Sequence, residues 1–188
     1  HLLMYVIVAA SVLRSERIWK WLMWTTLGVS VYLTVYGFLQ IFGVTALGQG
    51  GAGGLGARID ATFGNPIYFA VYMLFHVFIA AMLWAQAWVE RGPGKRMGVS
   101  LVYGAIIAGD TFMLLATATR GTILGLIGGA LLASVLVLLQ ANRSKTAWRA
   151  AAAGVVAILL LIGGFWMIRD ASFVKRIGFL QRMATIST

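Results

Sequence analysis

Two arginines and two polar helix starts are the features of this 188-residue sequence best suited to chemistry. Arg58 lies shortly before Asn65 and Pro66, and Arg120 directly follows Thr119. Asparagine or threonine just before a helix, and proline at its first position, are typical of helix N-termini. Such termini bind phosphate groups, and arginine adds a fixed charge with a bidentate fork. If both helices begin on one side of a membrane and are neighbours, these residues predict a diphosphate site.

Each arginine also has a structural alternative at the level of sequence. Arg58 could pair with Asp60, which lies two residues further along the same segment. Arg120 could extend its charge to lipid headgroups while its stem stays on apolar surface. Both alternatives stay open until the positions of the two helix starts are known.

His76 and Asp110 are ionisable residues deep inside apolar segments, where such residues are rare and are functional candidates by default. His76 follows Ile67 by nine residues, and Asp110 precedes Thr119 by nine. At a rise of about 1.5 Å per residue, both lie roughly 14 Å from the same membrane face. We predict that they contact each other. The contact has two interpretations: a structural tie between helices, or the proton relay of a transporter.

The composition places these residues in a membrane protein. Hydrophobic residues make up 61% and charged residues 11%, with a net charge of +10 and no cysteine. This excludes a soluble domain, a disordered chain and a disulfide-stapled domain. In a membrane protein a basic excess marks loops rather than a nucleic-acid footprint. We therefore predict an all-α, polytopic transmembrane helical bundle that contacts the lipid bilayer and binds no nucleic acid.

Five apolar stretches reach the length of about 20 residues that crosses a bilayer. They cover residues 21–47, 67–89, 99–119, 122–140 and 150–168. Residues 2–13 are apolar but too short, and we interpret them as the end of a span that begins earlier. The prediction is one transmembrane domain (1–188) with five complete spans and one partial N-terminal span, a fragment of a larger protein. Residues 48–66 form a Gly-rich loop, and residues 169–188 begin a larger one.

The basic residues of the loops predict which loops face the cytoplasm. Three lie in each of the segments 14–20, 91–96 and 143–149, whereas the intervening connections hold only Arg58 and Arg120. The positive-inside rule places the three richer segments in the cytoplasm and the two arginines on the opposite side. The tail after residue 168 then breaks the rule. Either a long external segment crosses regardless of charge, or the tail, through residues such as Arg176, contacts an anionic ligand.

The glycine spacing and the absence of several motifs indicate further what the sequence can and cannot do. Gly121, Gly125 and Gly129 recur every four residues, which predicts a face for close helix packing. With no cysteine and two separated histidines, the sequence predicts neither a zinc nor a haem site. The phosphate-loop and nucleophile-elbow motifs are both absent from the sequence. We expect no metal and no cofactor.

Three segments resemble the superfamily of O-antigen ligases and O-antigen polymerases, bacterial inner-membrane enzymes that act on lipid-linked glycans. Residues 58–70 (RIDATFGNPIYFA) are similar to the family's arginine before a G-N-P helix start. Residues 116–126 (ATATRGTILGL) are similar to its [S/T]-R-G start of a later helix. Residues 176–187 (RIGFLQRMATIS) resemble the stretch that leads into the family's large periplasmic loop.

The resemblance implies a metal-independent glycosyltransferase of the bacterial inner membrane. Such an enzyme moves a glycan from undecaprenyl diphosphate to a sugar hydroxyl, on lipid A core in lipopolysaccharide biosynthesis or on another glycan. Arg58 and Arg120 match the arginines that hold the diphosphate, and Asn65, Thr119 and Arg176 complete the predicted substrate site. The family's general-base histidine follows the position of Thr188, so we expect these 188 residues to be inactive alone.

Two other functions compete with the glycosyltransferase. The first is a polytopic transporter that uses His76 and Asp110, because proteins described as bicarbonate transporters share the motifs of this superfamily. The second is a structural membrane subunit with no chemistry of its own. Substitution of the arginines separates the glycosyltransferase from the other two.

Overall fold

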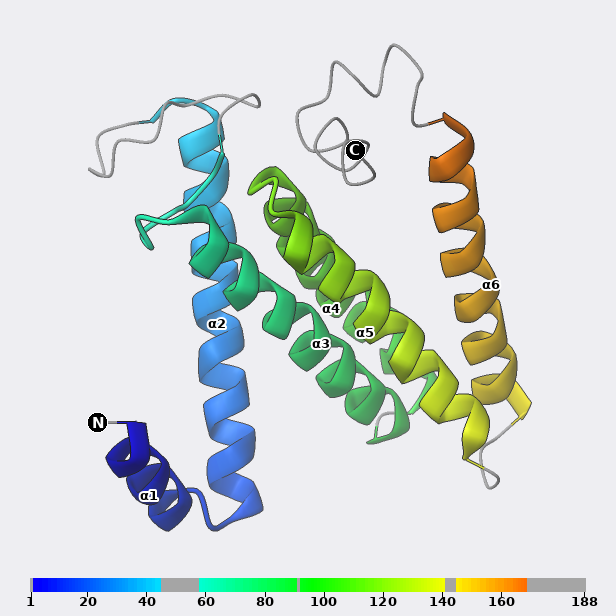
Figure 1. The fold of residues 1–188 in the computed structure, drawn as a ribbon. Helices are drawn as coiled ribbons and strands as arrows, with labels where there is room; N and C mark the ends of the chain where they lie inside the picture. Colours follow the sequence, from blue (N-terminus) through cyan, green and yellow to red (C-terminus); the bar gives the residue numbers. More distant parts are fainter. Residues whose placement is uncertain (1, 45–57, 91, 141–144, 169–188) are drawn as a thin grey trace.

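The computed structural model in Figure 1 describes residues 2–44, 58–90, 92–140 and 145–168. These residues form helices and connecting turns, and no strand occurs among them. The helices are α1 (Leu2–Val12), α2 (Glu16–Ile41), α3 (Pro66–Glu90), α4 (Pro93–Ala116), α5 (Arg120–Leu139) and α6 (Lys145–Ile168). The helices α2 to α6 are long and apolar enough to cross a membrane, whereas α1 has only 11 residues. For the described residues this confirms an all-helical fold with five helices that are long and apolar enough to span a membrane.

Several spans begin earlier than predicted, because charged residues at a helix end do not stop the helix. The helix α2 begins at Glu16 rather than residue 21, α4 at Pro93 rather than 99, and α6 at Lys145 rather than 150. At the start of α2, the Ser15 hydroxyl accepts a hydrogen bond from Ile18 N at 3.3 Å and caps the helix. Long basic side chains of such first turns extend into the headgroup region while the backbone stays helical.

The helix α2 ends at Ile41, earlier than the predicted residue 47, and its last turn explains the stop. Gly43 adopts a φ of 77°, a left-handed conformation that glycine reaches without strain. Val44 N donates to Leu39 O, and Gly43 N donates to Gln40 O. This is the Schellman arrangement, which satisfies the last carbonyls of a helix. Of the predicted Gly-rich loop, residues 48–66, the part 48–57 lies outside the described residues.

The helices α2, α3 and α4 contact one another, α5 packs on α3 and α4, and α6 packs on α5. Figure 1 shows α6 at one flank of the bundle and the short α1 beside the first turns of α2. Two clusters of buried side chains fill the space between α2, α3 and α4. One includes Leu33, Met73 and Met113, and the other includes Leu27, Leu83 and Val99. Most large apolar side chains elsewhere are exposed, as expected of surfaces that face lipid.

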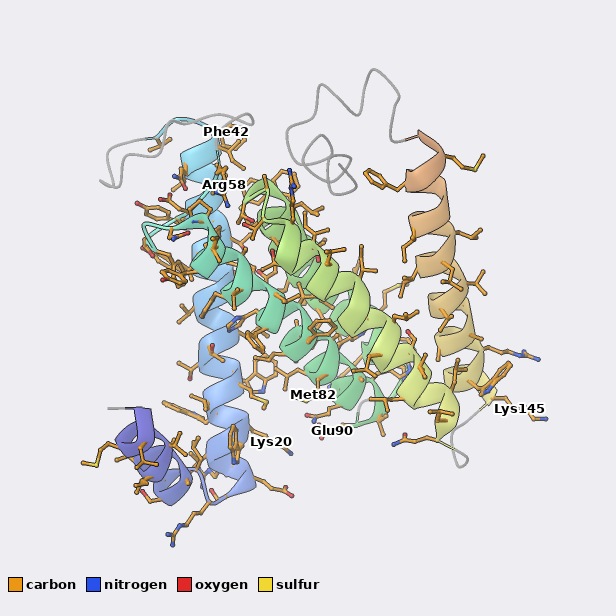
Figure 2. All side chains as sticks on the ribbon, in the orientation of Figure 1. Lys20, Phe42, Arg58, Met82, Glu90 and Lys145 are labelled. Atoms are coloured by element: carbon orange, nitrogen blue, oxygen red, sulfur yellow. The ribbon has the colours of Figure 1, made fainter. Side chains whose placement is uncertain are left out.

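The connections alternate between the two ends of the bundle. Figure 2 shows Phe42 and Arg58 at one end, and Lys20, Glu90 and Lys145 at the other. The α4–α5 turn, which precedes Arg120, lies at the end with Arg58. We call this end the outer end and the opposite one the inner end. The predicted grouping of the arginines on one side is therefore present in the fold.

Two of the three regularly spaced glycines lie where α5 approaches α3. A Cβ atom on Gly125 would lie 3.1 Å from Leu74 Cδ2, and one on Gly129 would lie 2.6 Å from Phe78 Cζ. Leu74 and Phe78 belong to α3. Gly121 faces open space, and a Cβ atom added there would have nothing within 4 Å. The glycine face therefore lies against α3, and Phe69 and Ile123, from the first turns of the two helices, belong to one buried cluster.

Candidate functional site

The segment that carries Arg58 is tied to the end of α2 by one side chain. Gln40, which is buried, accepts a hydrogen bond from Ala61 N at 3.0 Å and donates to Asp60 Oδ1 at 2.8 Å. Ile59 and Ala61 are buried beside the core, with exposures of 1% and 0%. The segment therefore folds back into the outer end of the bundle instead of extending away from it.

Arg58 bridges from this segment to the turn between α4 and α5. Its Nε donates to Thr117 O at 3.0 Å, and its Nη2 donates to Thr119 Oγ1 at 3.2 Å. The alternative pairing with Asp60 is not adopted, since that carboxylate accepts from Gln40 instead. Arg58 thus lies beside the residue that immediately precedes Arg120.

The α4–α5 turn is short and tightly held. Thr117 is fully buried, and its hydroxyl donates to Leu114 O at 2.7 Å. Ala118 has a φ of 51°, and Ala61 on the facing segment has a φ of 49°. Left-handed backbone in residues other than glycine is strained, and it persists only where surrounding contacts enforce it. Ala118 lies between the two threonines that accept from Arg58, and Ala61 follows Arg58 by three residues.

Thr119 occupies the predicted N-cap position of α5, but its hydroxyl does not cap the helix. That hydroxyl accepts from Arg58 instead, while the Thr119 carbonyl accepts from Ile123 N and from the Thr122 hydroxyl. The first backbone N–H groups of α5 therefore receive no side-chain cap from Thr119. They add positive partial charge beside the exposed Arg120, where the helix begins.

The start of α3 follows its prediction more closely. Asn65 Oδ1 accepts from Ile67 N at 2.9 Å, and the Asn65 carbonyl accepts from Tyr68 N and Phe69 N. Pro66 is the first helical residue. Because Ile67 N is bonded to the Asn65 side chain, this N–H group of α3 is not available to an anion. The start of α5 has no such side-chain cap from its N-cap residue, Thr119.

The outer end therefore brings together Arg58, Thr119 and the first residue of α5, Arg120. We call these three residues the outer-end site. Its donors are a guanidinium in a fixed orientation, a second exposed guanidinium and uncapped backbone N–H groups, a set that suits a phosphate or diphosphate. Arg176, the fifth predicted substrate residue, lies outside the described residues, as does the whole segment 169–188.

His76 is buried, as predicted, but its partners are different from the predicted one. Its Nδ1 donates to Tyr72 O at 2.7 Å, and its Nε2 lies 2.6 Å from Thr26 Oγ1. The Tyr72 ring stacks on the imidazole with centroids 4.0 Å apart. Both ring nitrogens are thus occupied by groups on α2 and on the helix α3 itself.

Asp110 is 1% exposed, and it also bonds to α2. Thr34 Oγ1 donates to its Oδ1 at 2.8 Å, and Ser30 Oγ donates to its Oδ2 at 3.0 Å. The predicted direct pairing is not adopted, since no hydrogen bond or ion pair joins His76 and Asp110 in the described part of the chain. The physical reason is that α2 lies against both helices and presents hydroxyls at both depths.

The residues that sequence reasoning missed are polar side chains on one face of α2. They are Thr26, Ser30, Thr34 and Gln40. The first three recur every four residues inside an apolar run, which is a helical period. That spacing in the sequence is the signal that would have indicated a polar face on this span.

Among the described residues, no three His, Cys, Asp or Glu side chains come close enough to hold a metal ion. No protein-family model, no curated protein and no solved structure matches this chain. The functional conclusion therefore depends on the geometry of the chain itself and on the resemblance of its motifs.

Proposed function

We propose that this chain is the membrane core of a glycosyltransferase similar to the O-antigen ligases. It would move a glycan from undecaprenyl diphosphate to an acceptor sugar hydroxyl at the outer face of a bacterial inner membrane. Arg58 and Arg120 of the outer-end site would hold the diphosphate. One observation carries the proposal: Arg58 is hydrogen-bonded to Thr117 and Thr119, directly beside the start of α5.

The hydrogen bonds of Arg58 support binding by a fixed fork. A guanidinium has five N–H donors. Two of them bond to the α4–α5 turn, and these bonds hold the plane of the group. Within the described part of the chain, the other N–H groups of Arg58 remain for a ligand. A fork whose orientation is already set loses less side-chain entropy when it binds a phosphate.

The proposed reaction uses these cations for the leaving group. The acceptor hydroxyl oxygen bonds to the anomeric carbon of the glycan, the bond from that carbon to the diphosphate oxygen breaks, and the hydroxyl proton passes to a base. Negative charge then grows on the departing undecaprenyl diphosphate. Positive groups aimed at that charge lower the barrier more than they stabilise the substrate. Arg58, Arg120 and the first N–H groups of α5 would fill this role without a metal.

Binding of undecaprenyl diphosphate to the chain in phosphatidylcholine nanodiscs tests the proposal. We expect Arg58→Ala and Arg120→Ala to weaken binding by about 10-fold or more each, since a hydrogen bond to a charged group contributes about 1.5–3 kcal/mol. Arg58→Lys keeps the charge but lacks the fork, and we expect it to recover only part of the affinity. Undecaprenyl monophosphate should bind more weakly than the diphosphate.

Arg149 provides the matched control, because it is an exposed arginine in the first turns of α6 at the inner end. Arg149→Ala should bind like the unchanged chain. Circular dichroism of each variant checks that the helices are retained. Unchanged affinity in both outer-end variants, or an equal loss in Arg149→Ala, would refute the diphosphate site.

A second candidate function is transport, and the burial of Asp110 favours it. A carboxylate that is 1% exposed within a membrane span is costly and is usually retained for function. Proteoliposomes loaded with a pH-sensitive dye would report bicarbonate or proton flux. If the chain is a transporter, Asp110→Asn abolishes flux and Arg58→Ala does not. The absence of flux in the unchanged chain removes this candidate.

A further inference from the structure

An open groove of about 440 Å³ runs along the first turns of α2 at the inner end. We call it the inner-end groove, and its lining is Glu16, Arg17, Lys20, Trp21 and Trp24. Figure 2 shows Lys20 at the end of the bundle opposite Arg58. The groove is therefore separate from the outer-end site, and an inference about it is independent of the proposed function.

The lining residues share one face of α2. Measured from Arg17, the positions of Lys20, Trp21 and Trp24 follow at three, four and seven residues, which is the spacing of neighbours on one side of a helix. Trp21 is 75% exposed and Trp24 is 52% exposed. The Trp24 ring lies 5.8 Å from the ring of Tyr103 on α4. This contact fixes one wall of the groove against the bundle.

The corner that precedes the groove is also held in place. Trp19 Nε1 donates to Leu13 O at 2.9 Å across the turn between α1 and α2. The Ser15 hydroxyl caps the first turn of α2. The first turn, which carries Glu16 and Arg17, is therefore part of a defined structure rather than a frayed helix end.

The groove combines two cations with two indole rings at the end of a membrane span. Tryptophan favours the headgroup level of a bilayer, and basic pockets at that level bind anionic lipid headgroups. Arg17 and Lys20 can donate to phosphate oxygens, while the indole rings contact the glycerol and the first acyl carbons. Glu16 opposes part of this charge, so the lining has a net charge of one positive unit at neutral pH.

We propose that the inner-end groove binds the phosphodiester headgroup of an anionic phospholipid. Phosphatidylglycerol has the required chemistry, because its phosphate keeps a net negative charge. Phosphatidylcholine carries its own cation, which competes with Arg17 and Lys20 for the phosphate. The groove is open rather than enclosed, which allows a lipid to enter sideways from its leaflet.

Native mass spectrometry of the detergent-solubilised chain tests the proposal, with dioctanoyl phosphatidylglycerol as the probe. We expect this lipid to bind at least 10-fold more tightly than dioctanoyl phosphatidylcholine. The double variant Arg17→Gln and Lys20→Gln should bind the anionic lipid about 10- to 30-fold more weakly. Inorganic phosphate at millimolar concentration should not displace the lipid, since it lacks the glycerol and acyl groups that contact Trp21 and Trp24.

Lys145 and Arg149 supply a matched control at the same end of the bundle. Both are exposed, they flank the exposed Trp148, and they belong to α6. The double variant Lys145→Gln and Arg149→Gln removes the same charge and should retain binding. Equal losses in the two double variants would overturn the proposal, because binding would then follow overall charge. Equal affinity for both lipids, or displacement by phosphate, would overturn it as well.

Glu16→Gln gives a test that a folding defect cannot imitate. Removing this carboxylate from the lining leaves Arg17 and Lys20 without a competing anion. We expect the variant to bind dioctanoyl phosphatidylglycerol several-fold more tightly than the unchanged chain. Unchanged or weaker binding in a variant that keeps its helical circular dichroism signal would contradict a lipid headgroup at this position.

Discussion

The guanidinium of Arg58 makes two hydrogen bonds that a lysine could not combine in the same geometry. It joins the segment before α3 to the turn before α5 through bonds to Thr117 O and Thr119 Oγ1. It also lies beside Thr119, the residue that immediately precedes Arg120. A lysine ammonium has three donors on a flexible stem and no fixed plane. The two bonds to the α4–α5 turn therefore depend on the planar shape of arginine as well as on its charge.

The buried ionisable residues Asp110 and His76 form their hydrogen bonds with individual hydroxyl side chains of α2. Asp110 has two hydroxyl donors on α2, and His76 has one hydroxyl partner there. These bonds lower the cost of burying each ionisable group in a span. The two groups belong to one polar region between α2, α3 and α4, although they do not bond to each other. The hydroxyls of α2 thus replace the direct ion pair.

A double-mutant cycle should distinguish hydrogen bonds from Asp110 to the α2 hydroxyls from a direct pairing of Asp110 with His76. Thr34→Val and Asp110→Ala remove the two ends of one hydrogen bond, so their effects on the free energy of unfolding should be non-additive by about 0.6–1.7 kcal/mol. His76→Ala and Asp110→Ala, which remove no shared hydrogen bond, should show a smaller coupling. The measurement is unfolding in mixed detergent micelles. A coupling between His76 and Asp110 larger than that between Thr34 and Asp110 would contradict the contacts described above.

At the scale of elements, the approach of α5 to α3 decides how close together the starts of these two helices lie. Gly125 and Gly129 allow this approach, since side chains of α3 occupy the space where their Cβ atoms would lie. Small residues have the same role in many membrane helix pairs. The glycine spacing in the sequence is therefore connected to the outer-end site, because it brings the start of α5 near the start of α3.

Gly129→Ala tests this connection, with Gly121→Ala as its control. The new methyl group of Gly129→Ala would overlap the Phe78 ring, and we expect a loss of about 1–3 kcal/mol in the free energy of unfolding. Gly121 faces open space, so its substitution should cost little or slightly stabilise α5. The second change Phe78→Leu should restore part of the loss. Equal effects of the two glycine substitutions would refute close packing at Gly129.

The sequence predicts the presence of the helices better than it predicts their ends or their side-chain contacts. Apolar length identifies α2 to α6, and turn chemistry locates the starts at Asn65 and Thr119. Helix ends are harder, because α2, α4 and α6 extend through charged residues that a hydropathy pattern excludes. Side-chain partners are harder still. The order of the elements in the sequence does not indicate that α2 would supply hydroxyl partners to both His76 and Asp110, since this depends on how three helices pack.

Some residues of the outer-end site can be predicted from the sequence, whereas others are found only from how the helices pack. Arg58, Thr119 and Arg120 can be selected from residue type and position, and the fold places them at one end. Gln40 and Thr117 cannot be selected that way, although they hold Arg58 and its segment in place. Their roles come from contacts between residues far apart in the chain. Such contacts follow from the arrangement of the helices and not from local propensity.

At the scale of the whole molecule, the alternation of the connections predicts which residues are accessible from each side of a membrane. The sequence contains no cysteine, so a single introduced cysteine gives an unambiguous signal. Phe42 is 77% exposed at the outer end, and Arg149 is exposed in the first turns of α6 at the inner end. These two positions suit a labelling experiment because neither belongs to the outer-end site.

We expect a membrane-impermeant maleimide to label Phe42→Cys in intact cells. Arg149→Cys should be labelled only after the membrane is opened. The positive-inside rule gives this orientation, because the inner end carries more lysine and arginine. The measurement is the shift in mass of the labelled chain on a gel. Labelling of both positions from the same side would contradict the order of the spans, and the reverse pattern would invert the proposed outer end.

The hydroxyl-bearing face of α2 has a consequence for synthesis at the ribosome. In the finished bundle, Ser30 and Thr34 bond to a residue of α4, yet α4 is made long after α2 leaves the exit tunnel. Until then Ser30 keeps only its bond to Leu27 O within α2, and Thr34 would meet lipid, where unsatisfied polar groups are unfavourable. Of the five candidate spans, α2 has the lowest hydropathy. We therefore expect nascent α2 to remain beside the insertion machinery until α3 and α4 emerge and release it into the bilayer.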